Sequence, residues 1–254
     1  MSKVKVLILR TQGTNCDNET AFAFEQAGAV TSLVHIDELI QHQRKLSDFQ
    51  IMAIPGGFTY GDDLGAGKVL ANEIGLKLSQ EIQSFIESGR PILGICNGFQ
   101  VLVKTGILPG PMISQQQVSF TDNDSGKFEC RWVHLKVNKE CPCLFTEGIE
   151  HLYLPVAHGE GKVVADSEVL PKLKAVLYYV DEMDNKAGYP YNPNGSIENI
   201  AGICDDSGRI FALMPHPERY IRKSQHPQWT KKGIDGRGDG FKIFANAVKW
   251  AQSL

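Results

Sequence analysis

The residue with the clearest chemical potential is a cysteine flanked by glycines at the end of an apolar run. Residues 91–100 read PILGICNGFQ, so an expected strand ends in the pattern G-x-C-x-G just before an expected helix. This is the pattern of a nucleophile elbow with cysteine in place of serine. The tight turn strains the nucleophile's backbone and leaves no space for side chains two residues away. The start of the helix favours a thiolate, so Cys96 is predicted to be a nucleophile rather than a core cysteine.

A thiol nucleophile requires a base for its proton and a group that orients this base. Two histidines follow expected strands and have an acid two residues later, His216 with Glu218 and His158 with Glu160. An acid at this distance can fix the tautomer of the imidazole. A histidine at a strand end often only satisfies a hydrogen bond, and spacing alone does not choose between the two candidates.

A glycine pair, Gly56-Gly57, follows another expected strand. Such a pair lets backbone amides approach a ligand closely, as an oxyanion hole requires, and a plain tight turn explains it equally well. The stretch from Gly61 to Val69 departs from a phosphate loop in spacing and ends without the Ser or Thr that holds magnesium. No G-x-G-x-x-G turn follows the first strand. The sequence therefore shows no machinery for binding ATP or NAD.

The composition is that of an ordinary globular protein. The chain has 254 residues, of which 42% are hydrophobic and 22% charged, and its formal net charge is −3. This balance argues against nucleic acid and anionic membranes as partners. The first apolar run is too short for a signal peptide, and no window reaches the ~20 apolar residues of a membrane span. A cytoplasmic location with six reduced cysteines is therefore expected.

A second cysteine feature, Cys141-Pro142-Cys143, has the spacing C-x-C. It lacks a further Cys or His pair at the spacing of a zinc finger. We interpret it as a coincidental pair in a loop, and the sequence predicts no metal site.

The catalytic candidates must be positioned by the elements around them. The expected strands of the first half cover residues 4–9, 31–36, 49–54 and 91–95, and the expected helices cover 18–27, 71–88 and 99–104. This alternation predicts βαβ units with a parallel sheet between helices. Closely spaced strands are expected at 132–137, 151–156, 175–180, 199–204 and 209–214, before an amphipathic helix at 240–251. Residues 1–254 are thus predicted to form one α/β domain around a central, mostly parallel sheet, which the later strands extend or flank.

Six short motifs carry a resemblance to a known family. They are GTNCD at 13–17, PGGFTYGD at 55–62, CNGFQ at 96–100, FECR at 128–131, PVAHGEG at 155–161 and MPHPER at 214–219. In this order they resemble the class I, triad-type glutamine amidotransferases, and among these the glutaminase subunits of purine biosynthesis. The resemblance extends from Val4 to about Trp250.

The resemblance implies a role for each matching residue. It implies a triad of Cys96, His216 and Glu218, oxyanion-hole amides from Gly57 and Asn97, and a part for Gln100 in holding glutamine. The late histidine is therefore favoured as the base, and His158 is left without an assigned role. Two departures concern Thr59, where many relatives have Ser, and the segment 224–238, which is longer than in compact members.

The resemblance also implies what the chain does and with whom. A chain of this kind hydrolyses glutamine through a thioester and passes the ammonia to an ATP-dependent synthetase subunit, with or without a small third subunit. That partner amidates formylglycinamide ribonucleotide and uses the ATP and Mg²⁺, so no cofactor is expected in this chain. Two alternatives stay open: a stand-alone thiol hydrolase, in which the acid usually precedes the histidine, and a non-enzymatic redox sensor built on Cys96.

Overall fold

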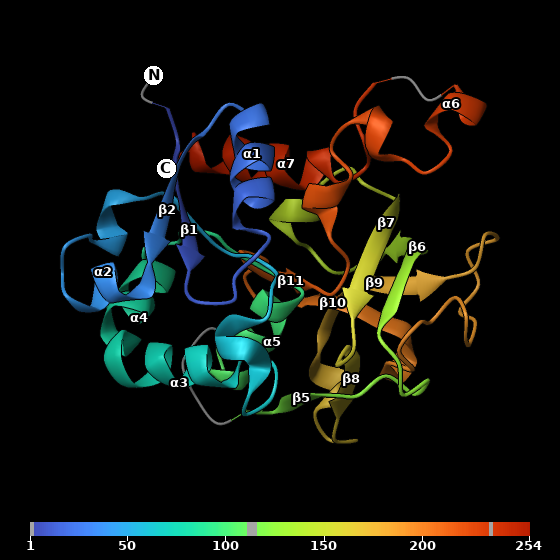
Figure 1. Ribbon diagram of the computed structural model, residues 1–254, viewed down its shortest axis with the longest axis horizontal. Coiled ribbons are helices and arrows are strands. Elements are labelled where there is room, and N and C mark those ends of the chain that lie inside the picture. The colour runs from blue at the N-terminus through green and yellow to red at the C-terminus, as the bar shows by residue number, and fades with distance from the viewer. Residues whose placement is uncertain (1–2, 111–115, 234–235) are drawn as a thin grey trace.

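The centre of the molecule is a nine-stranded sheet in the order β2-β1-β3-β4-β11-β10-β9-β6-β7 (Figure 1). The structure is a computed structural model that describes residues 3–110, 116–233 and 236–254. The strands of the sheet are β1 Lys5–Arg10, β2 Val30–His35, β3 Ile51–Ile54, β4 Ile92–Ile95, β6 Glu129–Val137, β7 His151–His158, β9 Lys174–Val180, β10 Ile200–Cys204 and β11 Ile210–Leu213.

One half of the sheet is parallel, and the other half extends it with antiparallel strands. The pairs β1–β2, β1–β3, β3–β4 and β4–β11 are parallel. The pairs β11–β10, β10–β9, β9–β6 and β6–β7 are antiparallel, so only β10 and β6 run against the other strands. All residues of β3 and β4 are buried, as is typical of parallel strands covered on both faces. The predicted mostly parallel α/β architecture is confirmed, and the later strands extend the same sheet.

Helices cover both faces of the parallel half (Figure 1). These helices are α1 Asp17–Gln26, α2 Ile36–Ile40, α3 Lys68–Lys77, α4 Ser79–Glu87, α5 Asn97–Lys104 and α7 Phe241–Ala251, whereas the short α6 Trp229–Lys232 lies away from this half. On one face α1 packs against α7, with the rings of Phe24 and Phe244 5.0 Å apart edge to face. On the other face α3 packs against α5.

One local expectation from the sequence was wrong, and one local feature was not predicted. The single helix expected over 71–88 is two helices, α3 and α4, because Leu78 between them has non-helical backbone angles and buries its side chain. A second, two-stranded sheet, which the sequence did not predict, pairs β5 Val118–Thr121 with β8 Lys162–Ala165. In the described parts of the chain, no helix is long and apolar enough to cross a membrane.

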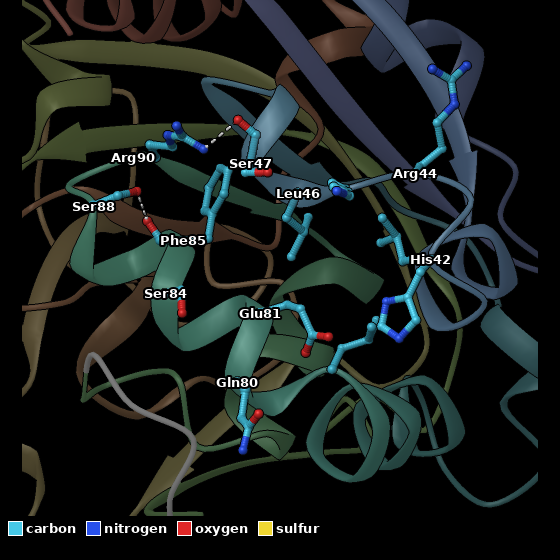
Figure 2. A pocket seen from close by; sticks show the side chains of 13 residues that line it. His42, Arg44, Leu46, Ser47, Gln80, Glu81, Ser84, Phe85, Ser88 and Arg90 are labelled. Atoms are coloured by element: carbon cyan, nitrogen blue, oxygen red, sulfur yellow. Dashed lines mark hydrogen bonds between the residues drawn. The ribbon is translucent and has the colours of Figure 1, made fainter.

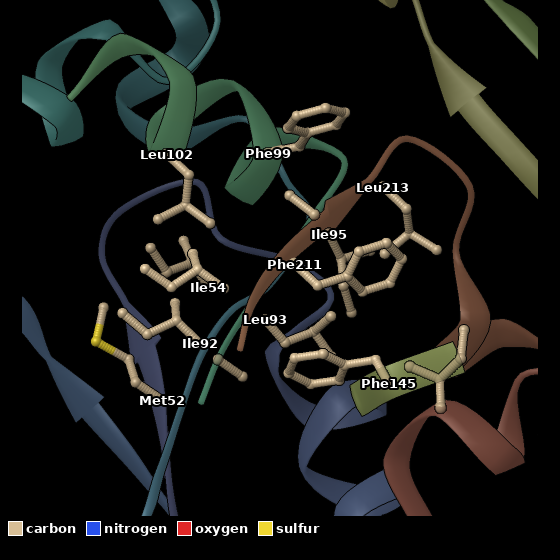
Figure 3. Close-up of a cluster of buried hydrophobic side chains, with 14 of the residues drawn as sticks. Met52, Ile54, Ile92, Leu93, Ile95, Phe99, Leu102, Phe145, Phe211 and Leu213 are labelled. Atoms are coloured by element: carbon tan, nitrogen blue, oxygen red, sulfur yellow. The ribbon is translucent and has the colours of Figure 1, made fainter. Parts of the chain in front are cut away.

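The turn between β4 and α5 is packed too tightly for side chains at its two glycines. Phe99 and Leu102 of α5 pack over Ile54, Ile95 and Leu213 of three neighbouring strands (Figure 3). A Cβ on Gly94 would lie 2.6 Å from a methyl carbon of Leu102. A Cβ on Gly98 would lie 1.9 Å from the carbonyl oxygen of Ile54. The steric reason predicted for both glycines is therefore confirmed, and α5 can approach the sheet only because they lack side chains.

The substitution Gly98→Ala is expected to destabilise the protein by at least ~1–3 kcal/mol, because the backbone oxygen of Ile54 cannot move away cheaply. The matched control is Gly75→Ala in α3, where no atom lies within 4 Å of the added Cβ, and a gain of about 0.5–1 kcal/mol is expected. Urea unfolding of both variants measures the difference. Equal stability of the two variants would contradict this account of the turn.

Candidate active site

The two central catalytic candidates lie at the ends of neighbouring strands. β4 and β11 are adjacent and parallel, with Ile95 opposite Leu213. The N–H of Cys96 donates to the carbonyl of Leu213 at 2.8 Å, so the chain leaves both strands at the same edge of the sheet. His216 follows three residues after Leu213. The structure thus brings together residues that are 120 positions apart, as the triad hypothesis requires.

Cys96 has the strained backbone that a nucleophile elbow imposes. Its φ of 50° and ψ of −103° are rare for a residue with a side chain. The strain is held by the packing of α5 and by the N–H groups of Phe99 and Gln100, which donate to the Cys96 carbonyl at 2.9 and 3.2 Å. The side chain is 5% exposed. The N–H groups of Asn97 and Gly98, which precede these two, have no acceptor within the helix and lie next to the thiol.

His216 and Glu218 form a short, buried hydrogen bond. Nδ1 of His216 and Oε1 of Glu218 are 2.6 Å apart, because a 3₁₀ turn over Pro217–Arg219 folds the carboxylate back onto the ring. Since a carboxylate accepts, Nδ1 carries the proton and Nε2 remains as the free ring nitrogen. Nε2 is buried and has no hydrogen-bond partner among the described residues. The pair therefore presents an oriented imidazole with one nitrogen ready for proton transfer.

The electrostatics of the site favour a protonated imidazole at His216. Burial lowers the pKa of His216, but the Glu218 carboxylate and the Cys96 sulfur outweigh it, so the pKa ends well above its ordinary value. The Cys96 thiol donates a long hydrogen bond of 3.8 Å to the carbonyl oxygen of Ala157. An imidazolium can stabilise the thiolate that forms when this proton leaves.

The glycine pair after β3 lies between the imidazole and the loop that follows β1. A Cβ on Gly56 would lie 2.8 Å from Cε1 of His216, and a Cβ on Gly57 would lie 2.8 Å from the carbonyl oxygen of Gly13. Gly57 also has a φ of +153°. Two backbone hydrogen bonds join the glycine pair to this loop: the N–H of Phe58 donates to the carbonyl of Gly13 at 2.9 Å, and the N–H of Cys16 donates to the carbonyl of Gly56 at 3.2 Å. Neither of these bonds uses the N–H of Gly57.

The side chain of Asn97 ties the glycine-pair loop to the elbow. Its Oδ1 accepts from the hydroxyl of Thr59 at 2.7 Å, and its Nδ2 donates to Asp62 Oδ1 at 3.1 Å. Nδ2 also donates to Gln100 Oε1 at 3.0 Å. The threonine that departs from the family's serine keeps the hydroxyl that this contact requires. The loop that carries Gly57 is therefore bonded to the first residue of α5, Asn97, the other predicted oxyanion-hole residue.

The end of β7 and the loop that follows it, residues 157–160, cross the elbow, and they contain His158 and Glu160, the alternative pair that the sequence offered. Ala157 accepts from the Cys96 thiol, and the backbone carbonyl of Glu160 accepts from the side-chain amide of Gln100. Both ends of the Gln100 amide are thus bonded to protein atoms. Gln100 therefore links Asn97 of the elbow to this loop, and each end of its amide keeps further hydrogen-bonding capacity.

His158 is fixed inside this loop rather than free to act on Cys96. Its Nδ1 lies 3.1 Å from Asn123 Oδ1, and its Nε2 lies 3.5 Å from Asn194 Nδ2. Asn123 Oδ1 also accepts from the N–H of Gly161, where a Cβ would lie 2.3 Å from Nδ1 of His158. The two asparagines had no signal in the sequence. Their network explains why the motif PVAHGEG needs both a histidine and a glycine.

A buried cysteine also lies beside the base. The ligand atoms of Cys16, His216 and Glu218 all lie within 4.8 Å of one another, and among the described residues they are the group of three that could hold a metal. The guanidinium of Arg219 donates to the Cys16 sulfur at 3.1 Å, so a positive charge already occupies this position. Burial is the largest cause that raises the pKa of Cys16. The chemistry of this cluster thus favours a thiol that accepts from arginine over a cation site.

A cavity of about 470 Å³ lies near the amino-terminal end of β4, at the end of the strands opposite to Cys96 (Figure 2). It opens between α4 and the 3₁₀ turn Leu46–Asp48, with Phe85 on one side. Arg90, which precedes β4, donates to the carbonyl of Ser47 at 3.1 Å there. Because Cys96 follows β4, this cavity belongs to the opposite end of the strands and not to the catalytic cluster.

Comparisons with known proteins point to one family. A family model of the CobB/CobQ-like glutamine amidotransferase domain matches residues 3–251. The chain is 62% identical over 256 residues to the phosphoribosylformylglycinamidine synthase subunit PurQ of Dehalococcoides mccartyi, with all of both chains covered. It is 44% identical to the subunit of the same name from Methanococcus maripaludis, with 97% of each chain covered.

A solved structure agrees with these matches. A chain in the structure of PurLQS from Thermotoga maritima superimposes with a TM-score of 0.75 and 35% sequence identity. The similarity covers 98% of this chain and 99% of that one.

The burial of His158 has a consequence for the pH dependence of stability. Burial is the main reason that the pKa of His158 falls to about 4, whereas an unfolded histidine titrates near ~6.5. The unfolded chain therefore binds a proton that the folded chain does not, so stability should fall between pH 6.5 and 4, by up to ~3 kcal/mol.

Urea unfolding at several pH values tests this expectation. The neutral variant His158→Gln should lose stability at all pH values but show a shallower decline on acidification than the parent. The exposed residue His42 provides the control, since His42→Asn tolerates the positive φ there and should leave the slope unchanged. Parallel pH profiles for the parent and His158→Gln would contradict the assignment.

Proposed function

The chain belongs to the CobB/CobQ-like glutamine amidotransferase family, and from this premise we propose that it is the glutaminase subunit of a phosphoribosylformylglycinamidine synthase. Full-length similarity to the PurQ subunits of that enzyme supports the assignment. One observation carries the catalytic part of the proposal. A strained, buried cysteine lies at the end of β4 beside a histidine–glutamate pair at the end of β11.

The proposed reaction begins with proton transfer and attack. Nε2 of His216 takes the thiol proton, and the Cys96 thiolate attacks the side-chain carbonyl of glutamine. The amides of Gly57 and Asn97 bind the oxyanion that develops, where one such donor is worth about 3–4 kcal/mol in comparable hydrolases. Collapse of the tetrahedral intermediate breaks the C–N bond, and the imidazolium gives its proton to the leaving ammonia.

Hydrolysis of the thioester completes the cycle. His216, oriented by Glu218, activates a water molecule that attacks the acyl carbon, and the Cys96 sulfur leaves with a proton. Gln100 supports the site by fixing the carbonyl of Glu160 in the loop that crosses the elbow. The products are glutamate and ammonia.

The ammonia is proposed to pass directly to a synthetase subunit. Free ammonia would become protonated in bulk water and lose its nucleophilicity, so direct transfer is favoured. The similar chain belongs to a complex called PurLQS, whose name includes two components besides PurQ. On that basis we propose a synthetase subunit and a small third subunit as partners. The synthetase would use ATP and Mg²⁺ to amidate formylglycinamide ribonucleotide, and no cofactor is proposed for this chain. A cytoplasmic location is proposed because all six cysteines are free.

The two alternatives have less support than this assignment. A stand-alone thiol hydrolase would usually place the acid before the histidine, whereas here the order is Cys96, His216, Glu218. A redox sensor built on Cys96 would not need the oriented imidazole with a free Nε2. Similarity over the full length to a glutaminase subunit favours the amidotransferase over both.

Ammonia release from glutamine tests the proposed function directly. The assay is run on the chain with its synthetase partner, with Cys143→Ala as a control because Cys143 lies in the loop after β6, at the end of this strand opposite to the one that approaches Cys96. Cys96→Ala should abolish ammonia release. His216→Ala should lower kcat by orders of magnitude, and His158→Ala should lower it less, because both ring nitrogens of His158 are bonded to asparagines. Full activity of Cys96→Ala, or the reverse order of the two histidines, would overturn the assignment.

The carboxylate of Glu218 provides a more specific test of the base. Glu218→Gln keeps a hydrogen-bond acceptor for Nδ1 but removes the charge that raises the pKa of His216. We expect kcat to fall roughly 10²- to 10⁴-fold, as for a triad whose orienting acid becomes an amide. The alkaline limb of the pH–rate profile should also move to lower pH, because the imidazolium is then lost earlier. An unchanged alkaline limb would show that Glu218 has no electrostatic role.

A further inference from the structure

Three cysteines from two distant segments of the chain lie together at the end of the strands opposite to Cys96. Cys141 and Cys143 lie in the loop after β6, and Cys204 ends β10. The sulfur atoms of Cys141 and Cys204 are 3.6 Å apart, although 63 residues separate them in the chain. Because β10 runs antiparallel to β11, its last residue lies beside the start of β11, opposite to the end that leads to His216.

The backbone segments that carry the two sulfur atoms are packed firmly together. Gly208 has a φ of +68°, and a Cβ there would lie 2.3 Å from the carbonyl oxygen of Pro142. The N–H of Leu144 donates to the carbonyl of Gly208 at 3.1 Å. Asp205 braces the turn after β10, since its Oδ1 accepts from the N–H of Ile210 at 2.8 Å. These contacts hold the loop after β6 and the turn after β10 against each other, and they thereby fix the short distance between the two sulfur atoms.

The geometry is close to that of a disulfide without being one. A disulfide has sulfur atoms about 2.05 Å apart, so the two sulfurs at 3.6 Å must approach by roughly 1.5 Å. Rotation of the two side chains about χ1 can supply a movement of this size without unfolding the turns. Cys204 also interacts with the thiol of Cys143, but the direct sulfur–sulfur contact is with Cys141.

The two thiols differ in reactivity and access. The hydrogen bond between the two thiols, aided by the ammonium of Lys174, lowers the pKa of Cys141 despite its burial. Cys141 also lines a cavity of about 600 Å³, whereas Cys204 has no exposed surface. A small reagent that enters the cavity can therefore reach Cys141, which has the Cys204 sulfur 3.6 Å away, and it can also reach Cys143, which lines the same cavity.

We propose that Cys141 and Cys204 form an oxidisable thiol pair, a modification site that is separate from the catalytic cysteine and that a peroxide converts into a disulfide. In the first step the Cys141 thiolate attacks one peroxide oxygen, the O–O bond breaks, and hydroxide leaves from hydrogen peroxide. In the second step the Cys204 sulfur attacks the sulfenic sulfur of Cys141, and its proton leaves with the hydroxyl as water. Two thiols and one peroxide thus yield one disulfide and two waters.

The disulfide would join the loop after β6 to the end of β10. Because it closes a long stretch of chain, it restricts the unfolded state and should raise the temperature of unfolding. The catalytic Cys96 lies at the opposite end of the strands, so oxidation of the pair should leave glutamine hydrolysis intact. These two consequences separate the pair from a redox sensor that acts through the catalytic thiol.

The experiment uses the full chain with its synthetase and one equivalent of hydrogen peroxide as the probe. Free thiols are blocked with iodoacetamide, and the unreduced digest is analysed by mass spectrometry. The expected result is a peptide pair joined through Cys141 and Cys204 that dithiothreitol separates. The oxidised protein should unfold at a higher temperature than the reduced protein and retain its glutaminase activity.

Three single variants make the result decisive. Cys204→Ser and Cys141→Ser should each abolish the cross-link and the shift in unfolding temperature. Cys130→Ser, at an exposed thiol, should retain both. Glutaminase activity of the reduced variants verifies that they fold. A cross-link from Cys204 to Cys143, or oxidation of Cys96 before any cross-link forms, would overturn the proposal.

Discussion

The hydrogen bond from the N–H of Cys96 to the carbonyl of Leu213 fixes the register on which the site depends. It is part of the pairing between β4 and β11, and it sets the position from which the chain leaves each strand. A shift of this register would move the thiol away from the imidazole, because each residue of a strand spans ~3.3 Å. The geometry of the candidate site is thus decided by the burial of two short apolar strands far apart in sequence.

The site combines several features that destabilise the folded state, and the packing around it must compensate for them. The backbone of Cys96 is strained, Nε2 of His216 and Oε2 of Glu218 are buried without partners among the described residues, and the glycines of the elbow admit no side chains. These features each oppose folding. They persist because α5 is pinned on the apolar strands beneath it (Figure 3). The rigidity of the elbow is therefore a consequence of the core and not of the turn alone.

The sequence was sufficient for the elbow and the strands because both depend on local patterns. G-x-C-x-G identified the turn, and short apolar runs located the parallel strands. The tie between His158 and His216 could not be broken by spacing, since it depends on Asn123 and Asn194, which close on His158 from other loops. The break at Leu78 was missed because tertiary burial of one side chain outweighed a continuous helical pattern. Long-range contacts of this kind leave no periodic signal.

The cysteines show how the fold gives one chemical group different properties. Cys96 is held at the carboxyl end of β4 beside an imidazole, and Cys16 accepts from the guanidinium of Arg219. Cys141 and Cys204 meet at the opposite end of the strands, where neither an imidazole nor an oxyanion site is nearby among the residues that contact them. The C-x-C sequence by itself gives no sign of this thiol pair, because the sulfur that Cys141 contacts belongs to Cys204 at the end of β10. Because β6 and β10 both run against the other strands, their last residues reach the same end of the sheet, and the fold can assemble there a thiol site that no sequence motif indicates.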